Sequence, residues 1–200
     1  MASKDKKAEI QEKNSWQKAV VLYLHDLICM LMVILILFLL VFRVIVVSGD
    51  SMKRTLLDGD YLLLLSNTFY REPVYGDIVV ISKESFDNGA PIVKRVIATE
   101  GQTVDIDFDQ GIVYVDGRVL QEPYILSPTT LSEGTKFPLT VSDNCIFVLG
   151  DNRGVSKDSR APEIGQIDRR EILGKAVFLM LPGDDQGEEP LDFDRIGVIK

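Results

Sequence analysis

Residues 75–101 read YGDIVVISKESFDNGAPIVKRVIATEG, and this stretch decides the fold class of the chain. It contains two short runs of apolar and β-branched residues, 75–82 and 91–101. The segment between them contains Asp, Asn and Gly, and Pro91 opens the second run; all four are turn-forming residues. Runs of this length and composition, bounded by such residues, are typical of β-strands. The stretch therefore predicts two strands joined by a loop.

The same pattern continues on both sides of this stretch. Five further segments are short, apolar or β-branched, and separated by Gly, Asp, Asn or Pro, namely 60–66, 102–107, 111–120, 144–151 and 174–181. An Asp-Gly pair between the two apolar halves of 111–120 is a hairpin signal. We therefore predict a mostly β domain with an antiparallel, barrel-like sheet over residues 48–182. Residues 183–200 are expected to form an acidic, solvated loop and a short C-terminal strand.

An unbroken apolar segment precedes this domain. Residues 27–47 carry Arg43 as their only charge. A helix of this length spans ~30 Å, which is enough to cross the hydrocarbon core of a membrane. Residues 1–26 contain five lysines, and positive residues beside a first helix stay in the cytoplasm. We therefore expect a single-pass protein of the cell membrane, with a cytoplasmic N-terminus over 1–26 and an extracytoplasmic β domain.

A competing interpretation treats the apolar segment as a cleaved targeting sequence. Val46 and Ser48 occupy the −3 and −1 positions of a possible cleavage site. However, the apolar core exceeds the roughly 7–15 residues of a secretory signal, and no helix breaker precedes the site. The uncleaved anchor is therefore favoured.

Composition excludes some functions. From Ser48 onward the chain has 16 Lys and Arg against 26 Asp and Glu, and such an acidic domain is a poor candidate for binding nucleic acid. The two cysteines, Cys29 in the apolar segment and Cys145 in a predicted strand, cannot form a disulfide framework. We therefore expect neither a nucleic-acid partner nor a fold that depends on disulfides.

Ser51 lies four residues after the apolar segment, in VVSGDSMKRTL at 46–56. The hydroxyl of Ser51 is a weak nucleophile at neutral pH and needs a base to act in catalysis. The usual base is histidine, but the only histidine, His25, precedes the apolar segment. With the orientation given above, it lies on the other side of the membrane, which excludes a Ser-His-Asp triad.

Lys94 is the alternative base. Strand periodicity places it on one face between Ile92 and Val96, where burial disfavours the charged form of an amine. Lowering its pKa from about 10.4 to the 7–8 range useful for a base requires ~3 units, or about 4 kcal/mol, which burial can supply. A strand lysine whose amine reaches solvent is the competing interpretation of the same pattern.

Five blocks of sequence suggest a specific family. In order after the apolar segment, they are VSGDSMKRTL, YGDIVV, VKRVIATEGQ, VLGDNRGVSKDSR and GKAVF. Together they resemble the bacterial type I signal peptidases, in the single-anchor form typical of Gram-positive bacteria. These are membrane proteases with a Ser/Lys dyad that remove signal peptides from exported proteins. The resemblance covers nearly the whole chain, to about Pro182.

The resemblance implies a role for each matching residue. Ser51 is expected to be the nucleophile and Lys94 the general base, while the Ser156 hydroxyl is expected to hydrogen-bond the lysine amine and orient it. Arg95 and Asp151 match an ion pair that braces the site. Asp158 and Arg160 match two further supporting residues. The residues expected to line shallow pockets for small substrate side chains are Val46, Val47, Met52, Leu56 and Val93.

The resemblance also implies the partners and the mechanism. Preprotein signal peptides are the expected substrates, and membrane lipid and the protein-export machinery are expected partners. A Ser/Lys mechanism uses neither a metal nor a cofactor. Residues 102–143 are expected to form a small lid on the β domain.

Three positions depart from the family pattern. Gly49 replaces a serine that donates to the oxyanion in many Gram-negative members, and Arg54 replaces the usual proline. Gly154-Val155 replaces Asp-Asn or Asn-Asn beside Ser156. These departures leave open a non-catalytic alternative, a membrane-anchored β domain that binds extended peptides. A self-cleaving Ser/Lys protease of the SOS-repressor type fits less well, because no DNA-binding region precedes the β domain.

Overall fold

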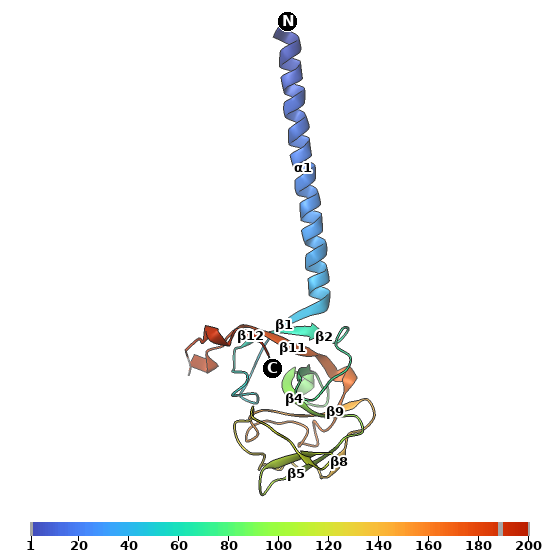
Figure 1. The fold of residues 1–200 in the computed structure, drawn as a ribbon, viewed down its shortest axis with the longest axis vertical. Helices are drawn as coiled ribbons and strands as arrows, with labels where there is room; N and C mark the ends of the chain where they lie inside the picture. Colours follow the sequence, from blue (N-terminus) through green and yellow to red (C-terminus); the bar gives the residue numbers. More distant parts are fainter. Residues whose placement is uncertain (1, 188–189, 200) are drawn as a thin grey trace. The chain divides into compact units, whose positions relative to one another are not determined.

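The computed structural model describes residues 2–187 and 190–199. The chain divides into two compact units, Met1–Val41 and Phe42–Lys200 (Figure 1). Positions 1, 188–189 and 200, which belong to the predicted segments 1–26 and 183–200, lie outside the described residues.

The first unit is a single helix, α1, which runs from Ala2 to Val41. Its stretch Lys18–Val41 has a mean hydropathy of 2.8 and is long and apolar enough to cross a membrane. The predicted spanning segment, 27–47, was wrong at its C-terminal end, because Phe42–Val46 form a strand, β1. Periodicity cannot separate a helix from a strand inside a run that is apolar at nearly every position. Full pairing of β1 with its neighbouring strand decides between the two here.

The second unit confirms the mostly β prediction. Over the described residues it contains two sheets, and every strand pairing in them is antiparallel. The larger sheet has the order β1-β2-β11-β3-β4-β9-β10, and β12 pairs with β11. Its remaining strands are β2 Tyr61–Ser66, β3 Ile78–Ile81, β4 Ile92–Thr99, β9 Cys145–Leu149, β10 Ile167–Asp168, β11 Ile172–Leu181 and β12 Gly197–Val198.

The smaller sheet lies within residues 102–143, the segment predicted to be a lid. Its order is β7-β6-β5-β8, with β5 Thr103–Asp107, β6 Ile112–Val115, β7 Arg118–Val119 and β8 Leu139–Thr140. Asp116 and Gly117 join β6 to β7 with φ values of 52° and 73°, so the predicted hairpin is confirmed. Within the second unit, β5 and β8 lie at the end opposite to β1, β2, β11 and β12 (Figure 1).

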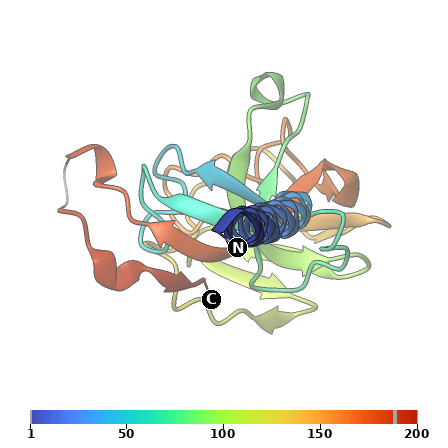
Figure 2. The same cartoon turned by 90° about the horizontal axis from the view of Figure 1, so that it is seen from above.

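Within the described part of the chain, four short 3₁₀ helices lie in the connections, at η1 Asp87–Gly89, η2 Arg169–Glu171, η3 Asp185–Gly187 and η4 Phe193–Arg195. Figure 2 shows the C-terminal segment in red, which runs out from β11 and returns so that β12 can pair with it. The expected short C-terminal strand is therefore confirmed. The expectation of a solvated loop before it was wrong at Asp185, which is only 2% exposed.

Strand β4 lies at the centre of the hydrophobic core. Its Val93 packs in a cluster with side chains of β2, β3 and β11, and Val96 packs in a second cluster with side chains of β3 and β9. Ile97 belongs to a third cluster, which joins the two sheets through side chains of β5, β6 and β9. Because β4 is packed in all three clusters, its backbone is a rigid support for Lys94 and Arg95.

Candidate active site

Ser51 lies in a tight turn that follows β1. The Lys53 amide donates to the Asp50 carbonyl oxygen at 3.0 Å, which places Ser51 and Met52 at the two central positions of the turn. Met52 is fully buried, whereas Ser51 is only partly buried. Burial of Met52 fixes the turn, and the serine hydroxyl stays accessible.

Lys94 points toward this serine from β4. Its amine lies 2.9 Å from Ser51 Oγ and donates at 3.0 Å to its own neighbour, the carbonyl oxygen of Val93. Lys94 is only 3% exposed, and burial lowers its pKa to about 8, against the raising effect of nearby carboxylates such as Asp158. An amine with this pKa is partly neutral near physiological pH, and a neutral amine at this distance can accept the serine proton.

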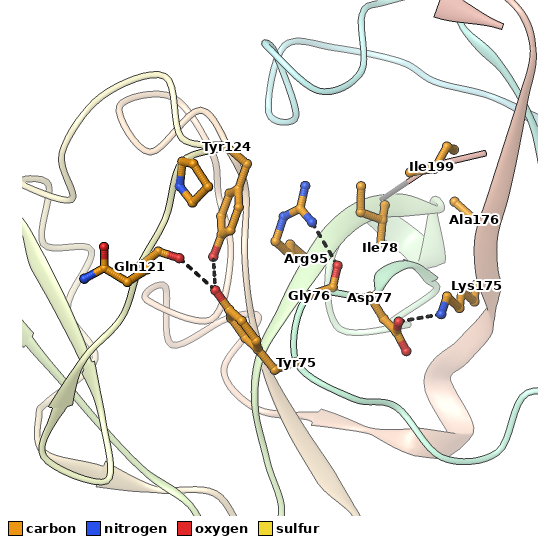
Figure 3. A pocket seen from close by; sticks show the side chains of 11 residues that line it. Tyr75, Gly76, Asp77, Ile78, Arg95, Gln121, Tyr124, Lys175, Ala176 and Ile199 are labelled. Carbon is orange, nitrogen blue, oxygen red and sulfur yellow. Dashed lines mark hydrogen bonds and ion pairs between the residues drawn. The ribbon is translucent and has the colours of Figure 1, made fainter. Parts of the chain in front are cut away.

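Arg95 points to the opposite face of β4 and forms a buried ion pair with Asp151. Its Nε and Nη2 lie 2.8 and 2.7 Å from the two carboxylate oxygens, and Thr55 donates to the same carboxylate. Figure 3 shows the guanidinium donating to the Gly76 carbonyl oxygen, with the Tyr124 side chain beside it. The central carbon of the guanidinium lies 4.1 Å from the centroid of the Tyr124 ring. Thr55 follows the Ser51 turn and Arg95 lies on β4, and both donate to the Asp151 carboxylate. Asp151 therefore connects the turn to β4.

A second buried ion pair braces the loop after β9. Both oxygens of Asp158 accept hydrogen bonds from Arg160, at 2.8 and 2.9 Å, and both residues are fully buried. Asp158 also accepts the Gly150 amide at 3.0 Å, and Arg160 donates to the Ser156 carbonyl oxygen. This network fixes the backbone of residues 150–160, and the Asn152 amide in that loop donates to the Ser51 carbonyl oxygen at 3.0 Å.

Comparison with known proteins identifies the family that carries this arrangement. Residues 20–181 match the family described as signal peptidase, peptidase S26. The chain belongs to the signal peptidase family. It is therefore a hydrolase of the signal peptidase type, as the sequence blocks predicted.

Two relatives agree with this assignment, and one similar solved structure is also found. The enzyme is 37% identical over 149 residues to "Probable signal peptidase I-1" of Synechocystis sp.. The aligned region covers 71% of this chain and 72% of the relative. It is 34% identical over 149 residues to signal peptidase I of Bacillus licheniformis, with 70% and 77% of the two chains covered. A crystal structure of a signal peptidase I from Enterococcus faecalis is 29% identical and covers 52% of this chain and 97% of its own, with a TM-score of 0.43.

One expected contact is not formed in this signal peptidase. Among the described residues, Ser156 Oγ is buried without a hydrogen-bond partner, so it does not hold the Lys94 amine as predicted. The lysine amine instead donates to Ser51 and Val93. Ser156 nevertheless lies close to the serine turn, because a Cβ built on Gly150 would be 2.1 Å from Ser156 Oγ and 2.5 Å from the Ser51 carbonyl oxygen.

The residues expected to line substrate pockets are mostly buried. Met52, Leu56, Val47 and Val93 pack in one hydrophobic cluster, whereas Val46 is 50% exposed. A cavity of about 620 Å³ in the enzyme is lined by other side chains, including those drawn in Figure 3. Pocket lining by these five residues therefore stays a prediction.

Two of the three departures from the family pattern have structural consequences. Gly49 has a φ of 87°, a conformation that favours glycine, and its amide donates to Asp58 at 2.6 Å. Because the Gly49 amide already donates to Asp58, it does not replace the serine hydroxyl that donates to the oxyanion in many Gram-negative members. Arg54 has a φ of 92°, which proline cannot adopt, and its guanidinium donates to the Ile125 carbonyl oxygen.

Sequence reasoning missed two residues of this site. Gly150 has to lack a side chain because of the close approach just described. Arg153 is fully buried, donates to the Gly150 carbonyl oxygen at 2.9 Å and pairs with Glu122. Both residues belong to the block VLGDNRGVSKDSR, so the block itself was the available signal. Burial of an arginine could not have been predicted, because arginine is mostly exposed in proteins.

Proposed function

We propose that the protein is a membrane-bound serine endopeptidase that removes N-terminal signal peptides from exported preproteins, with Ser51 as nucleophile and Lys94 as general base. One observation carries the proposal, which is the 2.9 Å contact between the buried Lys94 amine and Ser51 Oγ. The lowered pKa of Lys94 supports its role as the base. Membership of the signal peptidase family supports the substrate class.

The reaction follows from this geometry. Ser51 Oγ attacks the carbonyl carbon of the scissile bond and transfers its proton to neutral Lys94. The protonated amine then gives that proton to the leaving nitrogen of the mature protein, and an acyl-enzyme remains. Lys94, neutral again, accepts a proton from water as the water attacks the ester. The protonated amine then returns this proton to Ser51 Oγ as the ester bond breaks, which releases the signal peptide and restores both residues.

The negative oxygen of the tetrahedral intermediate requires hydrogen-bond donors. We assign the Ser51 amide to this role, because no hydrogen bond among the described residues occupies it. Asn152 holds the Ser51 turn by donating to the carbonyl oxygens of Asp50 and Ser51. The amide is thus oriented before the substrate binds, so little reorganisation is needed during the reaction.

Helix α1 supports the proposed location. The stretch Lys18–Val41 would cover ~36 Å as a helix, more than the ~30 Å hydrocarbon core of a bilayer. The lysines before it favour a cytoplasmic N-terminus and an extracytoplasmic second unit. Membrane lipid is then a partner of α1, and the enzyme works beside the protein-export machinery, from which its substrates emerge.

A preprotein cleavage assay on gels tests this function with the full-length protein in detergent or vesicles. Ser51→Ala and Lys94→Ala are expected to abolish cleavage, and Lys94→Arg should also fail because a guanidinium stays charged. Lys157→Ala is the matched control, since Lys157 is an exposed lysine in an ion pair with Glu163. Cleavage by Lys94→Ala at the wild-type rate would refute the dyad.

An acylation experiment separates the enzyme from a peptide-binding domain. A serine-directed acylating inhibitor is added to wild type and to Ser51→Ala, and intact mass is measured. We expect one adduct on wild type, located at Ser51, and none on the variant. A wild-type protein that binds peptides but forms no adduct would support the non-catalytic alternative.

A further inference from the structure

The C-terminal segment contacts the chain immediately around the candidate nucleophile. This segment follows Leu181, where the match to the family ends. Gly183 lies against the turn 57–60, and a Cβ built on it would be 2.1 Å from the Asp58 carbonyl oxygen. The approach is so close that only glycine fits. The contact is therefore specific packing rather than a loose end of the chain.

An ion pair joins this segment to the Ser51 turn. Lys53 Nζ lies 2.6 Å from Oδ2 of Asp185, whose side chain is only 3% exposed, so the contact is an ion pair by distance, although this oxygen accepts no hydrogen bond among the described residues. Lys53 is also the residue whose amide closes the turn on Asp50. Because Ser51 and Met52 are the two residues inside that turn, a contact that fixes the position of Lys53 also restrains the backbone of Ser51.

A second contact holds the following turn. The Asp60 carboxylate is fully buried and accepts four hydrogen bonds, from the amides of Leu57 and Gly183 and from both terminal nitrogens of Arg195. The guanidinium contacts measure 2.9 and 2.6 Å. A bidentate pair of this kind fixes orientation as well as distance. Asp60 therefore connects the segment that follows Ser51 to the C-terminal segment.

These contacts are separate from those that the loop after β9 makes with the same turn. The loop after β9 holds the carbonyl oxygens of Asp50 and Ser51 through Asn152. We propose that Asp185 and Arg195 are positioning residues of the active site, which anchor Lys53 and Asp60 and so hold the turn that carries Ser51. This inference rests on the proposed function, because it assigns to the C-terminal segment a part in the catalysis by Ser51.

A positioning role and a purely structural role of the Lys53–Asp185 contact can be distinguished by experiment. Lys53 is 30% exposed, so its amine stays in contact with solvent when Asp185 is replaced, and the fold survives. The turn then loses one of its two supports. Displacement of a catalytic group by about 1 Å can lower a rate as much as 10²-fold, whereas the stability cost of a partly exposed ion pair is small. Positioning and structural roles therefore predict different ratios of activity loss to stability loss.

A double-mutant cycle on the full-length enzyme tests the proposal. Lys53→Met, Asp185→Asn and the double variant are compared with wild type by kcat and KM for preprotein cleavage and by Tm. We expect each single variant to lower kcat about tenfold with little change in KM or Tm. The double variant should lose no more than Lys53→Met alone, because that single variant already removes the contact with Asp185. Lys53→Arg keeps the charge and is expected to restore most of the rate.

Two further measurements complete the test. Lys157→Met and Glu163→Gln remove an exposed ion pair of similar length, 2.7 Å, and should leave kcat unchanged. Amide hydrogen exchange over residues 50–56 should be faster in Asp185→Asn than in wild type and unchanged in these controls. Wild-type rates in Lys53→Met and Asp185→Asn would overturn the proposal, as would losses that follow Tm and are not restored by Lys53→Arg.

Failure of the proposed function gives a different result. In that case wild type and Ser51→Ala cleave the preprotein equally or not at all, and the comparison of rates has no basis. Hydrogen exchange still decides whether Asp185 holds the turn. Unchanged exchange in Asp185→Asn overturns the anchoring, and faster exchange supports it.

Discussion

Burial of Lys94 predicts how cleavage depends on pH. Only the neutral amine can accept the Ser51 proton, and burial lowers its pKa from 10.5 to about 8. At pH 7 about a tenth of the enzyme then carries a neutral lysine, compared with about one molecule in three thousand for an unshifted amine. The structure therefore implies a gain of roughly 300-fold in available base at neutral pH.

The assay is kcat/KM for preprotein cleavage, measured from pH ~6 to ~9.5. We expect kcat/KM to rise about tenfold per pH unit below a half-maximum near pH 8, and to be flat above it. Tm recorded at each pH is the control for unfolding. A half-maximum near pH 10, or a rate that does not change with pH, would refute the reasoning, because the amine would then not be the buried base.

The same shift predicts a change in stability. The pKa of Lys94 is about 8 in the folded state and 10.5 in the unfolded state, so burial of the charged amine destabilises the fold. This destabilisation is complete below pH ~8 and absent above pH ~10.5. At 1.36 kcal/mol per unit the cost is about 3 kcal/mol. Lys94→Met should therefore raise the free energy of unfolding at pH 7 by about 3 kcal/mol and lose this advantage as pH rises through 8 toward 10.5. Denaturant unfolding of both proteins at several pH values measures the difference.

Three further predictions concern the supports of the site. Gly150→Ala should abolish cleavage and lower Tm, because its Cβ would overlap Ser156 Oγ, whereas Gly154→Ala, whose Cβ meets nothing closer than 3.8 Å, should be tolerated. Asp151→Asn leaves the guanidinium of Arg95 buried without its charge partner, and we expect urea unfolding to show a loss of about 3–5 kcal/mol. Arg54→Pro forces a φ of about −65° where the chain has 92°, so Tm should fall even though proline is usual at this position in the family; an unchanged Tm would contradict this.

The strands were largely predictable, because their pattern is local. The runs at 75–82 and 91–101 are bounded by turn residues, and both became strands, β3 and β4. The hairpin at Asp116-Gly117 was predictable for the same reason, since its φ values depend on those two residues alone. β1 was not predictable, because its residues continue an apolar run and only the pairing with β2 distinguishes them from helix.

The site was predictable in part. The five sequence blocks indicated that Ser51 and Lys94 belong together, but strand periodicity alone left the lysine amine free to reach solvent. Contacts over long sequence distances were missed. Asp185 lies in an acidic run that is typical of a solvated loop, and its burial depends on Lys53, more than a hundred residues earlier. A sequence pattern contains no information on such a partner.

The pairing of β1 also shields a potential cleavage site within the chain. Val46 and Ser48 match the small-residue rule that the proposed substrates obey, so the chain carries its own potential cleavage site. A protease reads an extended peptide whose backbone is free, but Val46 is paired with Tyr61, and Val47 exchanges hydrogen bonds with Asp60 and Gly59. The susceptible bond is presented only after an edge strand has been pulled from the sheet. Strand pairing therefore keeps this bond out of an extended, unpaired conformation without any change in the motif itself.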